Sequence, residues 1–482
     1  MRQEYRRFMI ESFPTFHAFG VAFPQNMKKC ARVASKVAKG ALLIFVILAV
    51  VHSVSSFVIG KTLEKRIAAI RAKGEPVECV ELAGAKIPDS QNAAVIYDEI
   101  FKAREAAMKS VPSRYYQANM NIWSYDYKLL SPEERMKDAS LWGAARRVMA
   151  GQEKFFALTE EAVARPKCKF AVNWKDGSGA LFPYLIYIKQ QVRVLCTKAL
   201  LDARDGKMDD ALHNIELAFR VEELLKNEQL LVGQATRWTC IRTAVQGLRD
   251  ITTYGKISAD QGNKLSELLS KIDLRTGLVK GLKGNRTMLL WELDEIRKDP
   301  QRLFQMLPNE KQPSGIVAKV AYFVKRPLIY LDEIFLLDAY ASYIDAGQRP
   351  SREIRKDAKY SDTGKFPWYA QLSPMFMPTF GFIAVGCDAN KAEIEGSRIY
   401  LALQVYKAKF GTYPASLKDL QSKLGYNLPK DPLSGKDFIY HREPNGYLLY
   451  SIGRNLKDDG GVKDENIYNP PHLDDIIWRE AQ

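Results

Sequence analysis

The sequence predicts a mostly α-helical protein with an N-terminal membrane anchor and a small α+β module at the C-terminus. A single uncharged run of bilayer length predicts the anchor, helical periodicity predicts the middle, and strand-like patterns near the end predict the module. The length of 482 residues, with 46% hydrophobic and 26% charged residues, excludes wholesale disorder, collagen and a disulfide-stapled miniprotein. We expect a basic segment at 1–39, the anchor at 40–60, a helical domain at 61–346, a linker or packing strap at 347–387 and the α+β module at 388–482.

The predicted anchor is the only uncharged run that approaches the thickness of a bilayer. The 21 residues from Gly40 to Gly60 carry no formal charge, and a helix of this length spans about 30 Å of hydrocarbon. The second half is less apolar, because His52 and three serines follow Val51. A cleaved signal peptide is therefore the alternative, with Ser53–Ser55 as its small-residue cleavage site, although the long preceding segment favours an uncleaved anchor.

Basic residues set the expected orientation of the anchor. Eight Lys and Arg precede it against two Glu, and the fifteen residues on each side of it carry five basic residues apiece. Counted over the whole short N-terminal segment, the positive-inside rule places the N-terminus in the cytoplasm. We therefore expect a single-pass protein of the inner (cytoplasmic) membrane with its C-terminal bulk exported.

Net charge predicts no nucleic-acid partner. Of the formal charge of +15, the first 60 residues supply +6 and the rest of the chain supplies +9. That remainder is spread over some four hundred residues without a stripe of Lys and Arg interleaved with aromatic residues.

Cysteine spacing shows neither a redox motif nor a metal finger. The exported part holds Cys79, Cys168, Cys196, Cys240 and Cys387, an odd number with no CxxC pair. These residues are interpreted as buried small hydrophobes, and one or two unassigned disulfides are the alternative.

The middle of the chain contains a clear helical hairpin. Apolar residues from Val192 to Ala203 recur at helical spacing, Asp205-Gly206 ends this helix, and a second one begins near Asp209. The pattern resembles one tetratricopeptide-type unit, without a clean 34-residue period. Further helix starts are predicted at Ile87–Ser90, at Ser131–Glu134, and at Ser258 with Gln261; residues 316–344 are predicted as a buried helix rather than a second span.

The C-terminal module is predicted as one long helix packed on a small antiparallel sheet. The helix begins after about Asp388 and ends at Phe410, because Gly411–Pro414 cannot continue it. Ser416 caps a short helix at 417–424. Strand patterns follow at 438–440 and 447–452, and Pro444-Asn445-Gly446 between them predicts a hairpin.

The motifs of this module resemble a known family. RIYLALQVYKAKFGTYPASLKDL, LPKDPLSGKDFIYH, GYLLYSIGRNLKDDGG and LDDIIW follow one another in the order found in the globular head of major pseudopilins of type II secretion. The resemblance covers about Lys391 to Trp478. It implies a calcium ion in the loop after the YSxG strand, with Asp458 and Asp459 as ligands and Asp474 or Asp475 at the acidic position near the end. Carboxylate oxygens suit Ca²⁺; the alternative is a solvated acidic turn.

The whole chain also resembles membrane-anchored envelope proteins of planctomycete-like bacteria, which share an anchor, an IPDSQNAA-type helix start, a helical middle and this tail. That second resemblance implies no activity.

The sequence favours a binding protein over an enzyme. It has no HExxH, GxSxG, GxxxxGK[ST] or GxGxxG motif, and its five histidines are scattered. We expect a non-enzymatic, membrane-tethered interaction or scaffold protein with an unknown protein partner. The alternative is an envelope hydrolase or polymer-binding enzyme with a cleft between the helical domain and the C-terminal module. Convergent carboxylates or histidines in such a cleft would favour the enzyme.

Overall fold

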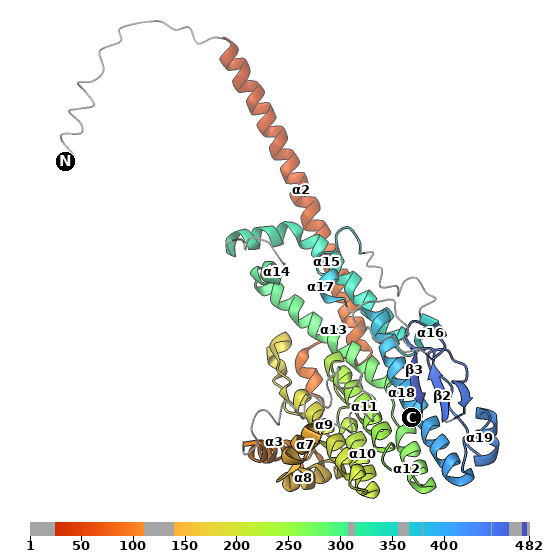
Figure 1. Ribbon diagram of the computed structural model, residues 1–482. Coiled ribbons are helices and arrows are strands. Elements are labelled where there is room, and N and C mark those ends of the chain that lie inside the picture. The colour runs from red at the N-terminus through yellow and green to blue at the C-terminus, as the bar shows by residue number, and fades with distance from the viewer. Residues whose placement is uncertain are drawn as a thin grey trace. The chain divides into compact units, whose positions relative to one another are not determined.

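The structure is a computed structural model that describes residues 25–109, 139–306, 313, 315–354, 366–377, 379–444, 446–461 and 475–479. The chain divides into two compact units, residues 1–61 and residues 62–482. In the described residues of the second unit, the regular elements are helices and one small sheet near the C-terminal end (Figure 1). The predicted fold class is therefore confirmed at this level: mostly helix, one long apolar N-terminal helix and a three-stranded sheet.

A single helix, α2 (Gln25–Ala72), contains the predicted anchor. The large apolar residues from Leu42 to Val58 are between 48% and 68% exposed, as expected of side chains that face lipid. In the part of the chain that the structure describes, this is the one helix long and apolar enough to cross a membrane. The alternative cleavage site at Ser53–Ser55 lies inside this helix.

Five helices build the centre of the second unit, and the predicted hairpin is its first pair. That pair is α9 (Pro183–Arg204) and α10 (Met208–Glu223), joined at Gly206, whose φ of 77° is the left-handed conformation predicted for the turn. The predicted capping box is also present, since the Ser258 hydroxyl accepts from the Gln261 amide and the Gln261 side chain accepts from the Ser258 amide. The five helices are α9 (Pro183–Arg204), α10 (Met208–Glu223), α11 (Leu231–Ile251), α12 (Ala259–Ser270) and α13 (Arg275–Lys298).

The helix predicted to open at Ile87–Ser90 begins later. Residues 89–91 form a 3₁₀ turn and the helix starts at Ala94. The cause is Asn92, whose backbone forms a parallel bridge with Lys167 and whose side-chain amide donates to the Lys169 carbonyl at 3.0 Å. The helix start predicted at Ser131–Glu134 lies outside the described residues.

Further elements surround this centre. Among them α15 (Gly315–Ala346) covers the helix predicted at 316–344, but its first part is not buried as predicted, because Ile316, Val320 and Val324 are each more than half exposed. The further elements are η1 (Cys79–Ala83), η2 (Asp89–Gln91), α3 (Ala94–Lys109), α7 (Ala139–Met149), α8 (Glu153–Ala164), η3 (Trp174–Gly179), α14 (Gln301–Met306), α15 (Gly315–Ala346), α16 (Ser351–Ile354) and α17 (Ser373–Phe376).

The five cysteines predicted to be buried are free thiols in the interior. Burial raises the pKa of the Cys79 thiol to about 11 and that of Cys387 to about 12, so neither is a thiolate at neutral pH. Cys196 lies on the inner face of α9, as its helical spacing predicted. The five are Cys79, Cys168, Cys196, Cys240 and Cys387.

The C-terminal module has the predicted order of elements up to the hairpin, and a third strand, β3 (Ile476–Arg479), which was not predicted, completes the sheet. Helix α18 (Phe380–Phe410) is followed by α19 (Leu417–Leu424), which Ser416 caps, and then by the sheet. The sheet is antiparallel in the order β1-β2-β3, with β1 (Ile439–Glu443), β2 (Gly446–Ser451) and β3 (Ile476–Arg479). Glu443 pairs with Gly446 across the predicted hairpin.

Helix α18 begins eight residues earlier than predicted, so the expected boundary between residues 387 and 388 falls inside it. Its buried residues belong both to the main core cluster of the helical domain and to the clusters of the module. At Gly396 a Cβ atom would lie 2.2 Å from the indole ring of Trp478, so this position requires glycine. Arg249 of α11 reaches the same strand by donating to the Ile477 carbonyl at 3.0 Å. The helical domain and the module are thus packed together.

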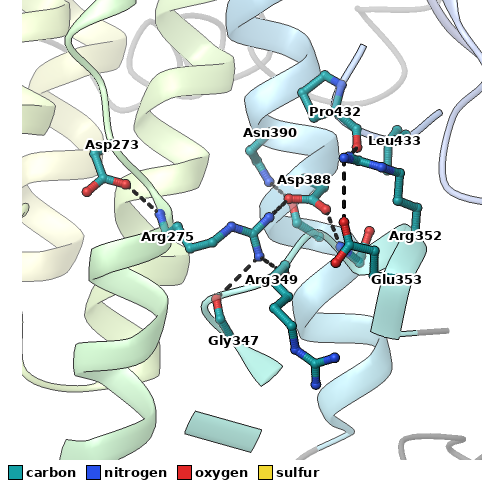
Figure 2. Close-up of polar contacts among 12 residues, drawn as sticks. Asp273, Arg275, Gly347, Arg349, Arg352, Glu353, Asp388, Asn390, Pro432 and Leu433 are labelled. Atoms are coloured by element: carbon teal, nitrogen blue, oxygen red, sulfur yellow. Dashed lines mark hydrogen bonds and ion pairs between the residues drawn. The ribbon is translucent and has the colours of Figure 1, made fainter. Parts of the chain in front are cut away.

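A buried carboxylate fixes the start of α18 to its neighbours (Figure 2). Asp388 is paired with Arg275 at the N-terminus of α13 and accepts from the Ser351 amide of α16 at 2.6 Å. Arg275 also donates to the Arg349 carbonyl at 2.5 Å. Nearby, Arg352 donates to the Pro432 carbonyl of the module at 2.9 Å. Burial raises the pKa of Asp388, and the charge of Arg275 opposes that rise.

We expect Asp388→Asn to destabilise the second unit by about 3 kcal/mol, because it leaves the Arg275 charge partly buried without its counter-ion. The measurement is the urea midpoint of the full-length protein in detergent. Asp345→Asn is the matched control, since Asp345 pairs with Arg349 at 3.9 Å and its side chain is 77% exposed. Equal midpoints for the two variants would contradict the role given to Asp388.

Candidate functional site

The acidic loop predicted to hold calcium follows β2. Leu456, Gly460 and Gly461 all have positive φ, which turns the chain back on itself. The Asp458 carboxylate accepts from the Tyr450 hydroxyl at 2.9 Å and from the Gly460 amide at 3.0 Å. These bonds hold the loop carboxylates beside the end of the strand.

Asp475 enters the same place from the residue before β3. One of its carboxylate oxygens, Oδ2, accepts from the Gly461 amide at 2.8 Å. The other, Oδ1, is buried and has no hydrogen-bond partner among the described residues. Burial raises the pKa of Asp475 to about 6, and the negative charges of Asp459 and Asp458 act in the same direction.

Three of the four predicted ligands are therefore close in space: Asp458, Asp459 and Asp475. Asp474 lies outside the described residues. An unpartnered buried carboxylate oxygen and mutual repulsion among carboxylates are what a hard cation would relieve. Among the residues that the structure describes, however, no group of three His, Cys, Asp or Glu has the geometry to hold a metal ion, so the calcium site stays a prediction.

Asp431 of the LPKDP motif has a structural role. It is 1% exposed, and its carboxylate accepts from the Leu433 amide at 3.0 Å and from the Ser451 hydroxyl at 2.9 Å. Ser451 belongs to the YSIG motif. The side chains thus join two of the motifs that carry the pseudopilin resemblance.

The histidines do not converge in the described part of the chain. His213 lies 3.0 Å from the Glu160 carboxylate, and both side chains are more than half exposed. His441 lies on β1 and His52 lies in α2. His472 is outside the described residues.

A polar cavity of about 250 Å³ lies in the helical domain, among α10, α11, α12 and the start of α13. A buried ion pair lines this cavity, in which Arg237 Nε lies 2.7 Å from Glu222 Oε2. Burial raises the pKa of Glu222, whose other oxygen has no hydrogen-bond partner among the described residues. Lys280 also lines the cavity and donates to the Asn227 side chain at 2.9 Å; burial and the charge of Arg237 lower its pKa.

The carboxylates of this cavity are already engaged. Glu222 is bound to Arg237, Glu223 is paired with Lys226 at 2.8 Å, and Asp273 accepts from the Arg275 amide at the start of α13. Burial accounts for the raised pKa of Glu222, and its partner Arg237 opposes that rise, so the shift needs no acid–base catalysis to explain it.

A second hollow, of about 240 Å³, lies between α12 of the helical domain and the C-terminal module, where a cleft was expected. We call it the interdomain cleft. Asn263, Ser266 and Tyr426 supply polar groups, and Arg398 supplies a cation that is paired with Glu395 at 2.6 Å. The residues seen to line it include neither a carboxylate nor a histidine: Gly262, Asn263, Ser266, Arg398, Ala402, Val405, Gly425, Tyr426, Asn427, Leu428 and Pro429.

The chain matches no model of a known protein family, no curated protein and no solved structure. The resemblance to pseudopilin heads and that to planctomycete-like envelope proteins therefore remain predictions.

Sequence reasoning missed the Glu222–Arg237 pair and the role of Asp431. The pair joins residues of two helices, and no local motif marks it. For Asp431 a signal was present, since Asp followed by Pro predicts a side chain that caps the next turn.

We expect Asp475 to make the module less stable at neutral pH when calcium is absent. Its folded-state pKa of about 6 exceeds the ordinary value of 3.8, so the folded form binds the proton more tightly and stability falls as the pH rises through this window. In chelator, the unfolding temperature should therefore rise as the pH is lowered from 7 towards 4.

Calcium should raise the unfolding temperature at pH 7, because it compensates the buried charge. Asp475→Asn should raise the unfolding temperature at pH 7 in chelator and abolish the calcium effect. Asp437→Asn, at an exposed carboxylate paired with Lys430, is the control. If calcium leaves the intact protein unchanged, the site is rejected.

Proposed function

We propose that this chain is a membrane-anchored, exported, non-enzymatic interaction protein of the bacterial envelope. The interdomain cleft carries the proposal, because its described lining offers hydroxyl, amide, aromatic and apolar groups rather than convergent acid and base. Tyr, Ser, Gly and Asn are the residue types with which proteins build adaptable binding surfaces. Tyr426, Ser266 and Asn263 bring that chemistry to one place.

The anchor supports the membrane part of the proposal. A helix with exposed apolar side chains from Leu42 to Val58 suits a single span. The excess of basic residues before it favours a cytoplasmic N-terminus in the inner membrane and an exported body.

The two domains would offer different contact surfaces. The α9–α10 hairpin supports a tetratricopeptide-like role, in which paired helices bind a segment of a partner. The C-terminal module supports a pseudopilin-like role, with calcium ordering the loop at Asp458 and Asp459. A place beside a secretion system follows from this second role and forms part of the proposal.

The alternative is an envelope hydrolase or polymer-binding enzyme. The cavity in the helical domain is the observation in its favour, because it gathers Glu222, Arg237 and Lys280. Its excess of cations over carboxylates suits capture of a small anion better than acid–base chemistry, since each carboxylate already has a structural partner.

Topology is tested with reporter fusions. Alkaline phosphatase fused after Gln482 should be active, because that enzyme folds only outside the cytoplasm, and a fluorescent protein there should be dark. The same reporters fused after Lys39 should give the reverse. An active phosphatase after Lys39 with an inactive one after Gln482 would reverse the orientation, and release of the body from the membrane by alkaline carbonate would show a cleaved signal.

Filling the interdomain cleft tests the binding role. We expect Ser266→Trp to remove a specific subset of proteins recovered with the full-length chain from solubilised native membranes, measured by quantitative mass spectrometry. Ser270→Trp is the matched control, because Ser270 is an exposed serine on the same helix, α12, that does not line the cleft. Identical protein sets from both variants would contradict a partner in the cleft.

A further inference from the structure

One stretch of α15 exposes apolar side chains that belong in neither water nor the protein core. Between Ile316 and Val324, five large apolar residues are each at least 52% exposed. Within residues 62–482, the other exposed large apolar side chains described are dispersed as single residues or one adjacent pair. A contiguous apolar patch of this kind marks a contact surface. The five are Ile316, Val317, Val320, Phe323 and Val324; we call them the α15 apolar face.

The opposite side of the same helix is buried in the protein. Ala318, Tyr322 and Ile329 share a core cluster with residues of α13 and α14. At 100° per residue these three lie within a narrow arc, and the α15 apolar face is centred on the far side of the helix. This part of α15 is thus fixed to the body by one side and presents a second apolar side outwards.

Cations flank the apolar face. On the helical projection Lys319 and Arg326 lie on one side of the apolar face, and Lys325 lies on the other side, next to the buried arc. Lys319 is exposed, and the two others are half-buried. No acidic residue occurs from Gly315 to Tyr330. An apolar face bordered only by cations is the pattern of a helix that lies in the interface of an anionic bilayer.

Helix α15 also bends just after the apolar face. Pro327 lies inside α15, and a proline bends a helix because it cannot donate to the preceding turn. Figure 1 shows the first part of α15 set at an angle to the rest.

The first residues of the second unit, which follow the anchor directly in the chain, lie against α15. Leu63 and Ile67 pack in one cluster with Tyr330, Ile334 and Leu337 of α15. Leu63 follows Gly60, the last residue of the uncharged run, by three positions, which is about 5 Å along a helix.

We propose that the α15 apolar face inserts into the interface of the anionic membrane that holds the anchor, with Lys319, Lys325 and Arg326 against lipid phosphates. The body then touches the membrane at two places, the anchor and this helix. The inference rests on the proposed membrane anchoring. The other conceivable occupants, a second copy of the chain or a partner protein, are separated from lipid by the experiment.

The test uses the full-length protein with a fluorescent NBD label at Val320→Cys, in a Cys30→Ser background because the other five cysteines are buried. Val232→Cys is the matched control, a valine of similar exposure on α11. Both proteins are reconstituted in vesicles of phosphatidylethanolamine and phosphatidylglycerol. Quenching by lipids spin-labelled near the headgroup and by aqueous iodide is then measured, and flotation after carbonate extraction reports the anchor separately.

We expect the label at 320 to be quenched at least twofold more by spin-labelled lipid than the label at 232, and to be shielded from iodide. Replacing Lys319, Lys325 and Arg326 together by Gln should reduce the lipid quenching. A label at 320 that is shielded from iodide but not quenched by lipid would assign the face to a protein and overturn the proposal. Equal iodide access at both positions would also overturn it. Loss of flotation would instead reject the anchor, so the two failures are distinguishable.

Discussion

One helix has to satisfy two hydrophobic cores. Buried residues of α18 belong both to the main core cluster of the helical domain and to the two clusters of the C-terminal module. A helix buried all round loses the polar face that usually sets its rotation in a fold. The rotation of α18 is instead set by two specific contacts. One is the ion pair between Asp388 and Arg275, and the other is the close packing of Gly396 against the Trp478 ring.

These contacts explain why the module is not an independent head on a flexible linker. Arg249 reaches from α11 to the last strand and to Glu393 of α18, and Arg352 reaches from α16 to the turn at Pro432. Each bond joins elements far apart in the sequence, so the module is held by the helical domain as well as by its own sheet. The interdomain cleft exists because α12 and the segment after α19 are held at a fixed separation.

Local signals predicted the elements well, and long-range pairs were not predictable. The Ser258 capping box, the stop at Gly206 and the hairpin at Gly446 depend on residues within a few positions of one another, and all are present. Asp388 finds Arg275 113 residues away, so no local pattern could assign it. The sequence pattern of α15 also could not show which of its apolar residues are buried and which are exposed. An apolar side chain has the same hydropathy whether it faces the core, lipid or a partner protein. For the acidic loop, the sequence named the residues, and only the fold shows that Asp475 is buried beside Asp458 and Asp459.

A second membrane contact has a consequence for binding. A body held by one span can tilt and turn, and a partner that fixes it has to offset that lost freedom. An interfacial helix would impose the restriction beforehand, and the packing of α18 would transmit the orientation to the interdomain cleft and to the acidic loop. Partners confined to the same membrane would then meet a surface that is already oriented, which raises their effective concentration without any additional contact. The apolar side chains exposed on α15 are costly in water, and a membrane contact would offset that cost while orienting the body.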